Sequence, residues 1–446
     1  MVLYALSAVL VATDGTGSDF HRRQAAALAD GHLDIRPVPV ALTSLPDPYD
    51  PEANLNVRVD GEVQDLAYRD GRLYSAHGLT VPLLLVPSEL MVGTSPPNWA
   101  ITLVGAWTAA GAGAWTLAQV RRRFVPDLPD WAAASSVFAF GLCGPLWAIT
   151  SVGNGYEAAI AVAAGLSMLS AGLLLRATEA LPRLCRWRAA LGSTLMALAV
   201  GTRPTAVVGA VVLGAAAWAV LRGRSTDDRS HALTDRRGDL CAIVGPFAAI
   251  IALLAMANLV RFGSPVEFGF GEQLSVWNMT EYPMNRPGHL VPNLADYAAA
   301  APDVRSSFPW ISLRATIGGD RPSMHTSEPI VGLLFCAPVL VVGLAALLGC
   351  WREMRRAARG LWTCIVAAAA TGSLALVAVS LPFNTSSLRY GVDGAPWLLL
   401  AACGSWAWAR NRREGGEGKG GSVLDRAWLI ALVIGIAVTA AVQVPV

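Results

Sequence analysis

The chain has 446 residues, of which 54% are hydrophobic and only 15% are charged. Soluble domains contain about 25% charged residues, so this composition argues against an ordinary water-soluble enzyme. The formal net charge of +2 is too small to indicate a nucleic-acid partner, because the arginines are scattered between apolar runs.

Long apolar runs predict an all-α polytopic membrane protein with about eleven transmembrane helices. A helix rises about 1.5 Å per residue, so about 20 apolar residues cross the hydrocarbon core of a bilayer. A cleaved signal peptide is the alternative for the first run, although that run lacks a basic flank and the usual length. The expected spans are residues 2–12, 99–120, 132–152, 155–176, 187–202, 204–221, 240–260, 329–350, 361–381, 394–409 and 427–445.

Basic residues follow every second predicted span, and these five connections hold 21 of the 34 lysines and arginines. The positive-inside rule places such connections in the cytoplasm. We therefore expect a multi-pass protein of the cytoplasmic (plasma) membrane, with a cytoplasmic N-terminus. The connections are residues 121–123, 176–188, 222–237, 352–359 and 410–426.

The same pattern divides the chain into membrane parts and two large extracytoplasmic loops. The first loop is expected to contain a short helix from Phe20 to Asp30 and an interfacial helix at 79–92. Two Asp-Gly pairs, at 60–61 and 70–71, predict hairpin turns. The expected parts are 1–12 (first transmembrane helix), 13–97 (first loop), 98–261 (helices two to seven), 262–328 (second loop, rich in aromatics) and 329–446 (helices eight to eleven).

Two acidic residues, Asp14 and Asp19, follow the first predicted span. A carboxylate at the membrane surface can act as general base on a hydroxyl whose co-substrate is anchored in lipid. The alternative is that these residues cap a helix in a solvated loop.

Two arginines stand near the outer ends of short spans. Arg203 lies between two spans with almost no loop, at a depth where ionisable residues are usually functional, and guanidinium groups bind phosphate oxygens well. The alternative is an arginine that snorkels to lipid head groups. Arg389 and Asp393 lie four residues apart, so they could pair with each other, or Arg389 could contact an anionic head group.

Several motifs are absent from the sequence. It contains no Walker loop, no GxGxxG after a strand, no HExxH and no GxSxG. No histidine pair has metal-ligand spacing on a helix, and none of the seven cysteines falls in the two large outer segments. Nucleotide-driven transport and zinc proteolysis are therefore unsupported, and no metal-ligating residue is assigned.

Five stretches together resemble bacterial membrane glycosyltransferases of the GT-C superfamily, the polyprenyl-phosphate-sugar-dependent type related to protein mannosyltransferases. Their order along the chain carries the likeness more than any one of them. They are SDFHRRQAAALADGHLDI (18–35), DLAYRDGRLYSAHGLTVPLLLVP (65–87), GTRPT (201–205), VRFGSPVEFGFGEQLS (260–275) and LRYGVDGAP (388–396).

The resemblance implies a GT-C-type fold and a mechanism. A sugar on a polyprenyl phosphate would be transferred, usually with inversion, to a hydroxyl of a glycan, lipid or protein acceptor at the outer leaflet. Asp19 matches the acidic position of the first outer loop best, with Asp14 as the reserve. Arg203 and Arg389 would stabilise the leaving phosphate.

The resemblance also implies contacts for the substrates. Asp65 would shape the acceptor site, Tyr74 and Glu267 would contact sugar, and Asp393 belongs to the motif of Arg389. No cofactor is assigned, although a divalent cation such as Mg²⁺ or Mn²⁺ remains open.

Two other functions stay open at this point. The first is a transporter or flippase for a lipid-linked or polar solute, although no internal repeat is visible and the informative polar residues cluster on one face. The second is a non-catalytic partner in a cell-envelope assembly.

Overall fold

The computed structural model describes residues 1–11, 19–60, 63–222, 229–281, 286–314, 326–381, 385–414 and 423–443. Helices occupy each of the eleven stretches that the sequence predicts as spans. The described helices of these stretches are α1 (Val2–Val11), α6 (Asn98–Phe124), α7 (Asp130–Leu142), α8 (Pro145–Ala148), η1 (Ile149–Ser151), α9 (Gly155–Ala177), α10 (Arg186–Val200), η2 (Pro204–Gly209), α11 (Ala210–Arg222), α12 (Arg229–Phe262), α14 (Leu333–Cys336), α15 (Val339–Ala357), α16 (Arg359–Ser380), α17 (Ala395–Glu414) and α18 (Val423–Ala441).

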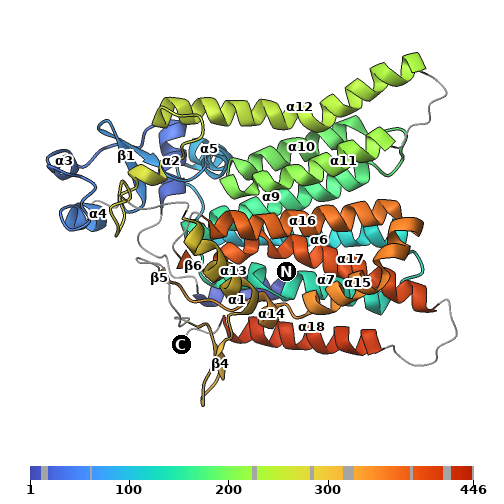
Figure 1. Cartoon of the computed structure of the whole chain (residues 1–446). Helices are drawn as coiled ribbons and strands as arrows, with labels where there is room; N and C mark the ends of the chain where they lie inside the picture. The colour runs from blue at the N-terminus through green and yellow to red at the C-terminus, as the bar shows by residue number, and fades with distance from the viewer. Residues whose placement is uncertain are drawn as a thin grey trace.

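The longer helices run side by side as one bundle (Figure 1). Within the described residues, six helices are long and apolar enough to cross a membrane, or seven if the bent pair formed by α7 and the segment Pro145–Ser151 counts as one span. The protein is therefore a helical membrane protein, and the count of eleven spans stays a prediction.

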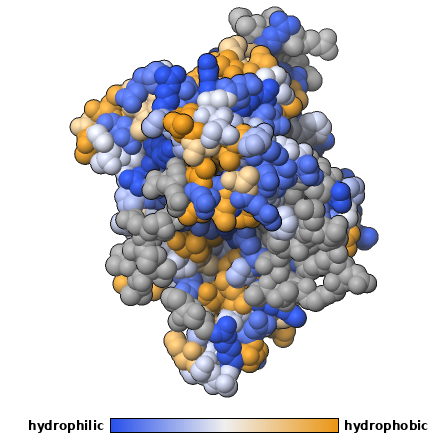
Figure 2. Space-filling model, turned by 90° about the vertical axis from the view of Figure 1, so that its left-hand side faces the viewer, coloured by the Kyte–Doolittle hydropathy of each residue, from blue (hydrophilic) through white to orange (hydrophobic). Residues whose placement is uncertain are grey.

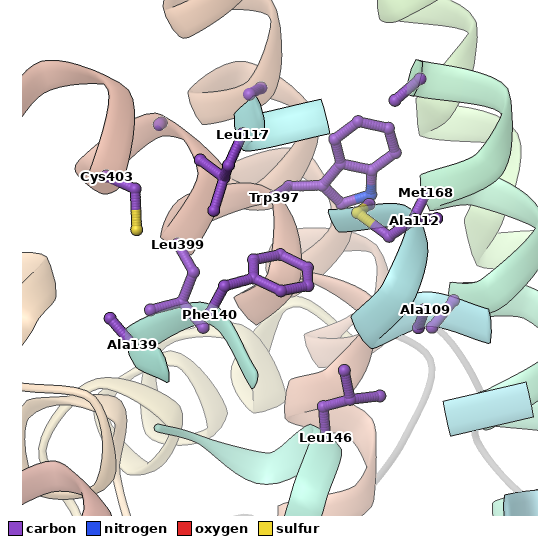
Figure 3. Packing of buried hydrophobic residues seen from close by; sticks show 14 of the residues in the cluster. Ala109, Ala112, Leu117, Ala139, Phe140, Leu146, Met168, Trp397, Leu399 and Cys403 are labelled. Atoms are coloured by element: carbon purple, nitrogen blue, oxygen red, sulfur yellow. The ribbon is translucent and has the colours of Figure 1, made fainter. Parts of the chain in front are cut away.

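Small residues allow the central helices to approach closely. A Cβ atom added at Gly105 of α6 would lie 2.6 Å from the backbone carbon of Ala161 in α9. Alanines of α6, such as Ala109 and Ala112, face Met168 of α9 in the core, beside Trp397 of α17 (Figure 3). Close contacts between small residues are the usual means of helix packing in a bilayer, where burial of apolar surface gives little driving force.

The two large loops gather at one end of the bundle (Figure 1). Their helices and strands are α2 (Phe20–Ala29), α3 (Val40–Thr43), α4 (Leu55–Asp60), β1 (Leu66–Arg69), β2 (Arg72–Ser75), α5 (Thr80–Val92), η3 (Phe270–Glu272), η4 (Pro287–His289), α13 (Leu290–Ala299), β3 (Asp303–Val304), β4 (Ile311–Ser312) and β5 (Thr326–Ser327). Strand β6 (Thr385–Ser386) and the 3-10 helix η5 (Leu388–Asp393) precede α17. Seen end on, this face mixes hydrophilic and hydrophobic residues (Figure 2).

The first loop and the start of the second fold together as one unit, although about 200 residues separate them. The edge of the β1–β2 hairpin is extended by a bridge between Ala67 and Gln273, and Leu274 donates its N–H to the Leu66 carbonyl at 2.9 Å. A shared apolar core strengthens this join. It consists of Phe20, Ile35, Leu42, Val63, Leu66, Leu73 and Leu274.

Local predictions in the first loop have different outcomes. The helix expected from Phe20 to Asp30 is α2. Gly31, which has a left-handed φ of 79°, follows its C-cap residue Asp30. The turn at residues 70–71 is confirmed, because Asp70 (φ 49°) and Gly71 (φ 74°) join β1 to β2. The hairpin expected around residues 60–61 is wrong: residues 55–60 form α4, and Val57 packs against the core of the unit.

Candidate active site

Charged residues from distant parts of the chain meet where the loop unit joins the bundle, and Arg389 of η5 lies at their centre. Its guanidinium is 2.6 Å from the Glu328 carboxylate and 3.6 Å from the Glu157 carboxylate. It also lies over the rings of Tyr156 and Tyr390, 4.9 and 5.2 Å from their centroids. Only 17% of the Arg389 side chain is exposed, so these contacts fix its position.

The second arginine, Arg203, reaches the same place from the end of α10. Its Nε and a terminal nitrogen donate to Oδ2 of Asp393 at 3.2 and 3.0 Å, and Thr205 donates to the same oxygen at 2.7 Å. The Arg203 guanidinium lies 5.4 Å from the centroid of the Tyr390 ring. The two predicted arginines therefore converge on one tyrosine.

These contacts correct two alternatives from the sequence. Arg389 and Asp393 do not pair with each other: the structure pairs Asp393 with Arg203, and Arg389 with Glu157 and Glu328. Arg203 does not snorkel to head groups, since only 14% of its side chain is exposed. Arg389 and Asp393 both belong to the 3-10 helix η5, where residues three apart share a face and residues four apart do not.

Asp65 provides a buried carboxylate beside this group. Its Oδ1 accepts from the amides of Gln64 (3.1 Å) and Gln273 (3.0 Å), and its Oδ2 accepts a hydrogen bond from the Tyr156 hydroxyl. Burial raises the pKa of Asp65 to about 6, although the amide donors and the charges of Arg58 and Arg389 act in the opposite direction. The Asp65 carboxylate can therefore gain or lose a proton near neutral pH.

The start of α9 holds Tyr156 and Glu157 in place. The side chain of Asn154 caps the helix by accepting from the backbone N–H groups of Tyr156 (2.9 Å) and Glu157 (3.3 Å). A carboxylate in the first helical turn is also favoured by the helix dipole. Glu157 is 3% exposed, and its Oε2 makes no hydrogen bond with the part of the chain that the structure describes.

Aromatic rings form one wall of the group. The Phe20 ring stacks on His77 with centroids 4.1 Å apart, and both rings contact Tyr156 edge-on at 5.4 Å. Burial lowers the pKa of His77 well below its usual value, and the nearby His21 and the two arginines lower it further. His77 is therefore neutral, so it adds an aromatic face but no charge.

The other predicted residues lie apart from this group or on its edge. Asp19 is at the N-cap position of α2 without capping it; it pairs with Arg22 at 3.0 Å and is 49% exposed. The Tyr74 ring packs edge-on against Phe262 at 5.6 Å. Glu267 accepts from backbone N–H groups of its own turn, at 3.0 and 2.7 Å. Asp14 lies outside the described residues.

Sequence reasoning missed Tyr156, Glu157, His77 and Glu328. Glu157 left a usable signal, because it is an acidic residue inside an otherwise apolar predicted span, and such residues are usually functional. Glu328 and His77 carry no comparable pattern. In the described ranges, no set of three or more His, Cys, Asp or Glu side chains is arranged to hold a metal ion.

The arrangement suits proton transfer next to a developing anion. A carboxylate with a pKa near 6 can accept a proton from a hydroxyl, and two fixed guanidinium groups can stabilise negative charge on a phosphate. Glu328, which is 35% exposed, is the most accessible partner of Arg389 and therefore the partner that an incoming anion would displace most easily.

Comparison with solved structures shows a likeness to an archaeal membrane enzyme. The chain is similar to the archaeal oligosaccharyltransferase AglB from Archaeoglobus fulgidus, solved with an inhibitory peptide and a dolichol-phosphate, at a TM-score of 0.41 and 12% identity. The match covers 98% of this chain and 54% of that one, so the chain spans about half the length of the structure it matches. At this TM-score the likeness carries no argument about family, substrates or residues. No protein-family model and no curated protein matches the sequence.

Proposed function

We propose that the chain is an integral membrane glycosyltransferase, which transfers a sugar from a polyprenyl-phosphate donor to an acceptor hydroxyl. One observation carries the proposal: Asp65, Glu157, Arg203 and Arg389, from four separate segments, meet in one largely buried group at the loop end of the bundle. This placement suits a donor whose phosphate lies at the membrane surface while its chain remains in lipid.

In the proposed step, the Asp65 carboxylate takes the proton of the acceptor hydroxyl. The hydroxyl oxygen forms a bond to the anomeric carbon of the sugar, and the bond between that carbon and the phosphate oxygen breaks. The electron pair leaves with the lipid phosphate, whose charge Arg389 and Arg203 stabilise. Attack from the face opposite the phosphate inverts the anomeric centre.

Asp65 is a better base than Asp19 in this proposal. The raised pKa of Asp65 suits proton uptake near neutral pH, and its carboxylate shares Tyr156 with Arg389. Asp19 is half-exposed and already paired with Arg22 on its own helix. Asp19 remains the general base that the family resemblance implies, and it is the alternative to Asp65.

The remaining parts of the proposal follow from the charge pattern of the sequence. The loop end would face the outside of the cytoplasmic membrane, eleven spans would place the N-terminus in the cytoplasm, and the acceptor would be a glycan, lipid or protein hydroxyl. Addition of Mg²⁺ or Mn²⁺ to the assay, and their removal by a chelator, tests whether a divalent cation assists.

The test is sugar transfer by the full chain reconstituted in vesicles with labelled polyprenyl-phosphate sugars. We expect a covalent product, and a loss of about 100- to 10,000-fold in the rate with Asp65→Asn. Asp70→Asn is the matched control, because Asp70 lies in the same hairpin, has the same left-handed backbone and is exposed. Equal losses in both variants would contradict a role for Asp65, and solute flux without a covalent product would favour a transporter.

A further inference from the structure

A large cavity lies among the helices at the opposite end of the bundle from the proposed active site. Its volume is about 640 Å³, within the range of about 300–1,000 Å³ that is usual for ligand pockets. Five helices contribute to its walls: α6, α9, α11, α16 and α17. Along α9, the distance from Glu157 to Thr178 at the cavity is about 30 Å at the helical rise per residue.

The lining of this cavity is apolar along its length and basic at one end. Leucine, valine and alanine side chains make up most of the walls. Trp397, which packs beside Met168 in the core (Figure 3), also lines the cavity. Arg123, Arg222 and Arg359 all line the cavity where their helices reach the basic connections. Among the residues that the structure describes, no acidic side chain lines it.

The three arginines differ in how they are held. Arg123 donates to the carbonyls of Leu175 (3.3 Å) and Thr178 (3.0 Å), so its position is fixed at the end of α9. Arg222 lies 4.4 Å from the ring centroid of Trp218. Across the residues that the structure describes, no carboxylate pairs with any of the three arginines. Their positive charge therefore remains available to a ligand.

We propose that this cavity binds one anionic phospholipid of the surrounding bilayer, with an acyl chain between the helices and its phosphate at Arg222 and Arg359. The apolar walls match a hydrocarbon chain, and the exposed Arg222 and Arg359 match the phosphate at the end of that chain. Inorganic phosphate could contact the arginines, but it would not occupy the apolar part of the cavity. The site does not depend on the proposed sugar transfer, because it lies at the other end of the bundle.

The test measures lipid retention and thermal unfolding of the full chain in phosphatidylcholine vesicles with and without phosphatidylglycerol. Native mass spectrometry should find one tightly held phosphatidylglycerol, and the unfolding temperature should rise when this lipid is present. Arg222→Gln combined with Arg359→Gln should weaken the binding by about tenfold or more, since each lost contact to phosphate removes charge-assisted hydrogen bonds.

Two further variants keep the test decisive. Arg352→Gln combined with Arg355→Gln removes the same charge from exposed positions of α15 at the same end, outside the cavity, and should leave binding unchanged. Ala219→Phe fills the cavity while it keeps all three arginines, and should also expel the lipid. Equal retention of phosphatidylcholine, equal effects of the two arginine pairs, or complete displacement by inorganic phosphate would each overturn the proposal.

Discussion

Two pairs of arginines, one pair at each end of the helical bundle, lie in opposite environments. At the loop end, Arg203 and Arg389 are largely buried, and each is paired with carboxylates from distant segments. At the opposite end, where the basic connections lie, Arg222 and Arg359 are exposed and, among described residues, have no acidic partner. The first pair is held by the protein as part of its fold, whereas the second pair is available to molecules in the bilayer.

This difference decides what each arginine contributes to stability and function. A buried ion pair is costly to form, but the loss of one partner leaves an uncompensated charge in a poorly solvated place. An exposed arginine loses little when it is replaced, because water and lipid head groups already solvate it. Substitutions in the two pairs should therefore differ strongly in their effect on the free energy of unfolding.

The largest effect is expected from Arg389→Met. This change leaves the Glu157 carboxylate, which is 3% exposed, without its cationic partner. We expect a loss of about 3–5 kcal/mol in the free energy of unfolding, measured by denaturation in mixed micelles. The double variant Arg389→Met and Glu157→Gln should recover most of this loss. A loss below about 1 kcal/mol for the single variant would show that the group at the loop end is solvated like an exposed pair.

A smaller effect is expected from Asp393→Asn. The substitution weakens the two hydrogen bonds from Arg203 and the one from Thr205. Hydrogen bonds to charged groups contribute about 1.5–3 kcal/mol, so we expect a loss of about 2 kcal/mol in the free energy of unfolding. A double-mutant cycle with Arg203→Gln should give a coupling of at least about 0.5 kcal/mol, since the side chains are in contact. Additive losses would contradict the pairing.

How far the sequence predicts this site depends on the range of the contacts involved. Apolar runs predict helices such as α6 and α9, because a single periodic segment contains the whole signal. The Asp70–Gly71 turn is local in the same way. The similar pair at 60–61 misled the prediction, since the packing of Val57 in the loop core outweighs the alternating pattern.

The active-site group is the opposite case. Both predicted arginines belong to it, but their acidic partners lie 190 residues away for Arg203 and 61 residues away for the pair of Arg389 and Glu328. No spacing rule in the sequence encodes such contacts. The sequence therefore allows the local ion pair of Arg389 and Asp393, and that alternative is wrong. Asp65 gains its unusual environment only when the second loop adds Gln273 and α9 adds Tyr156.

The proton affinity of Asp65 can be tested with the substitution Tyr156→Phe. Asp65 has a raised pKa of about 6, so its charged form is lost as the pH falls through 6, and kcat/KM for sugar transfer should fall with it. The Tyr156 hydroxyl donates to the charged form, so its removal should raise the pKa further and move this acidic limb to higher pH. Tyr49→Phe is the control, because Tyr49 donates to a backbone carbonyl in the same loop unit. An unmoved limb would exclude Asp65 as the titrating base.

The smallest effect is expected from Arg222→Gln in a neutral environment. Arg222 is exposed and lies against Trp218, so in phosphatidylcholine alone the free energy of unfolding should change by no more than about 0.5 kcal/mol. The contrast between the two arginine pairs requires this result. In that contrast, Arg222 stabilises the protein through a bound lipid and not through contacts within the fold. A loss as large as that of Asp393→Asn would mean that a protein carboxylate already holds Arg222. The two pairs of arginines would then be held in the same way, and Arg222 would not be available to select an anionic lipid.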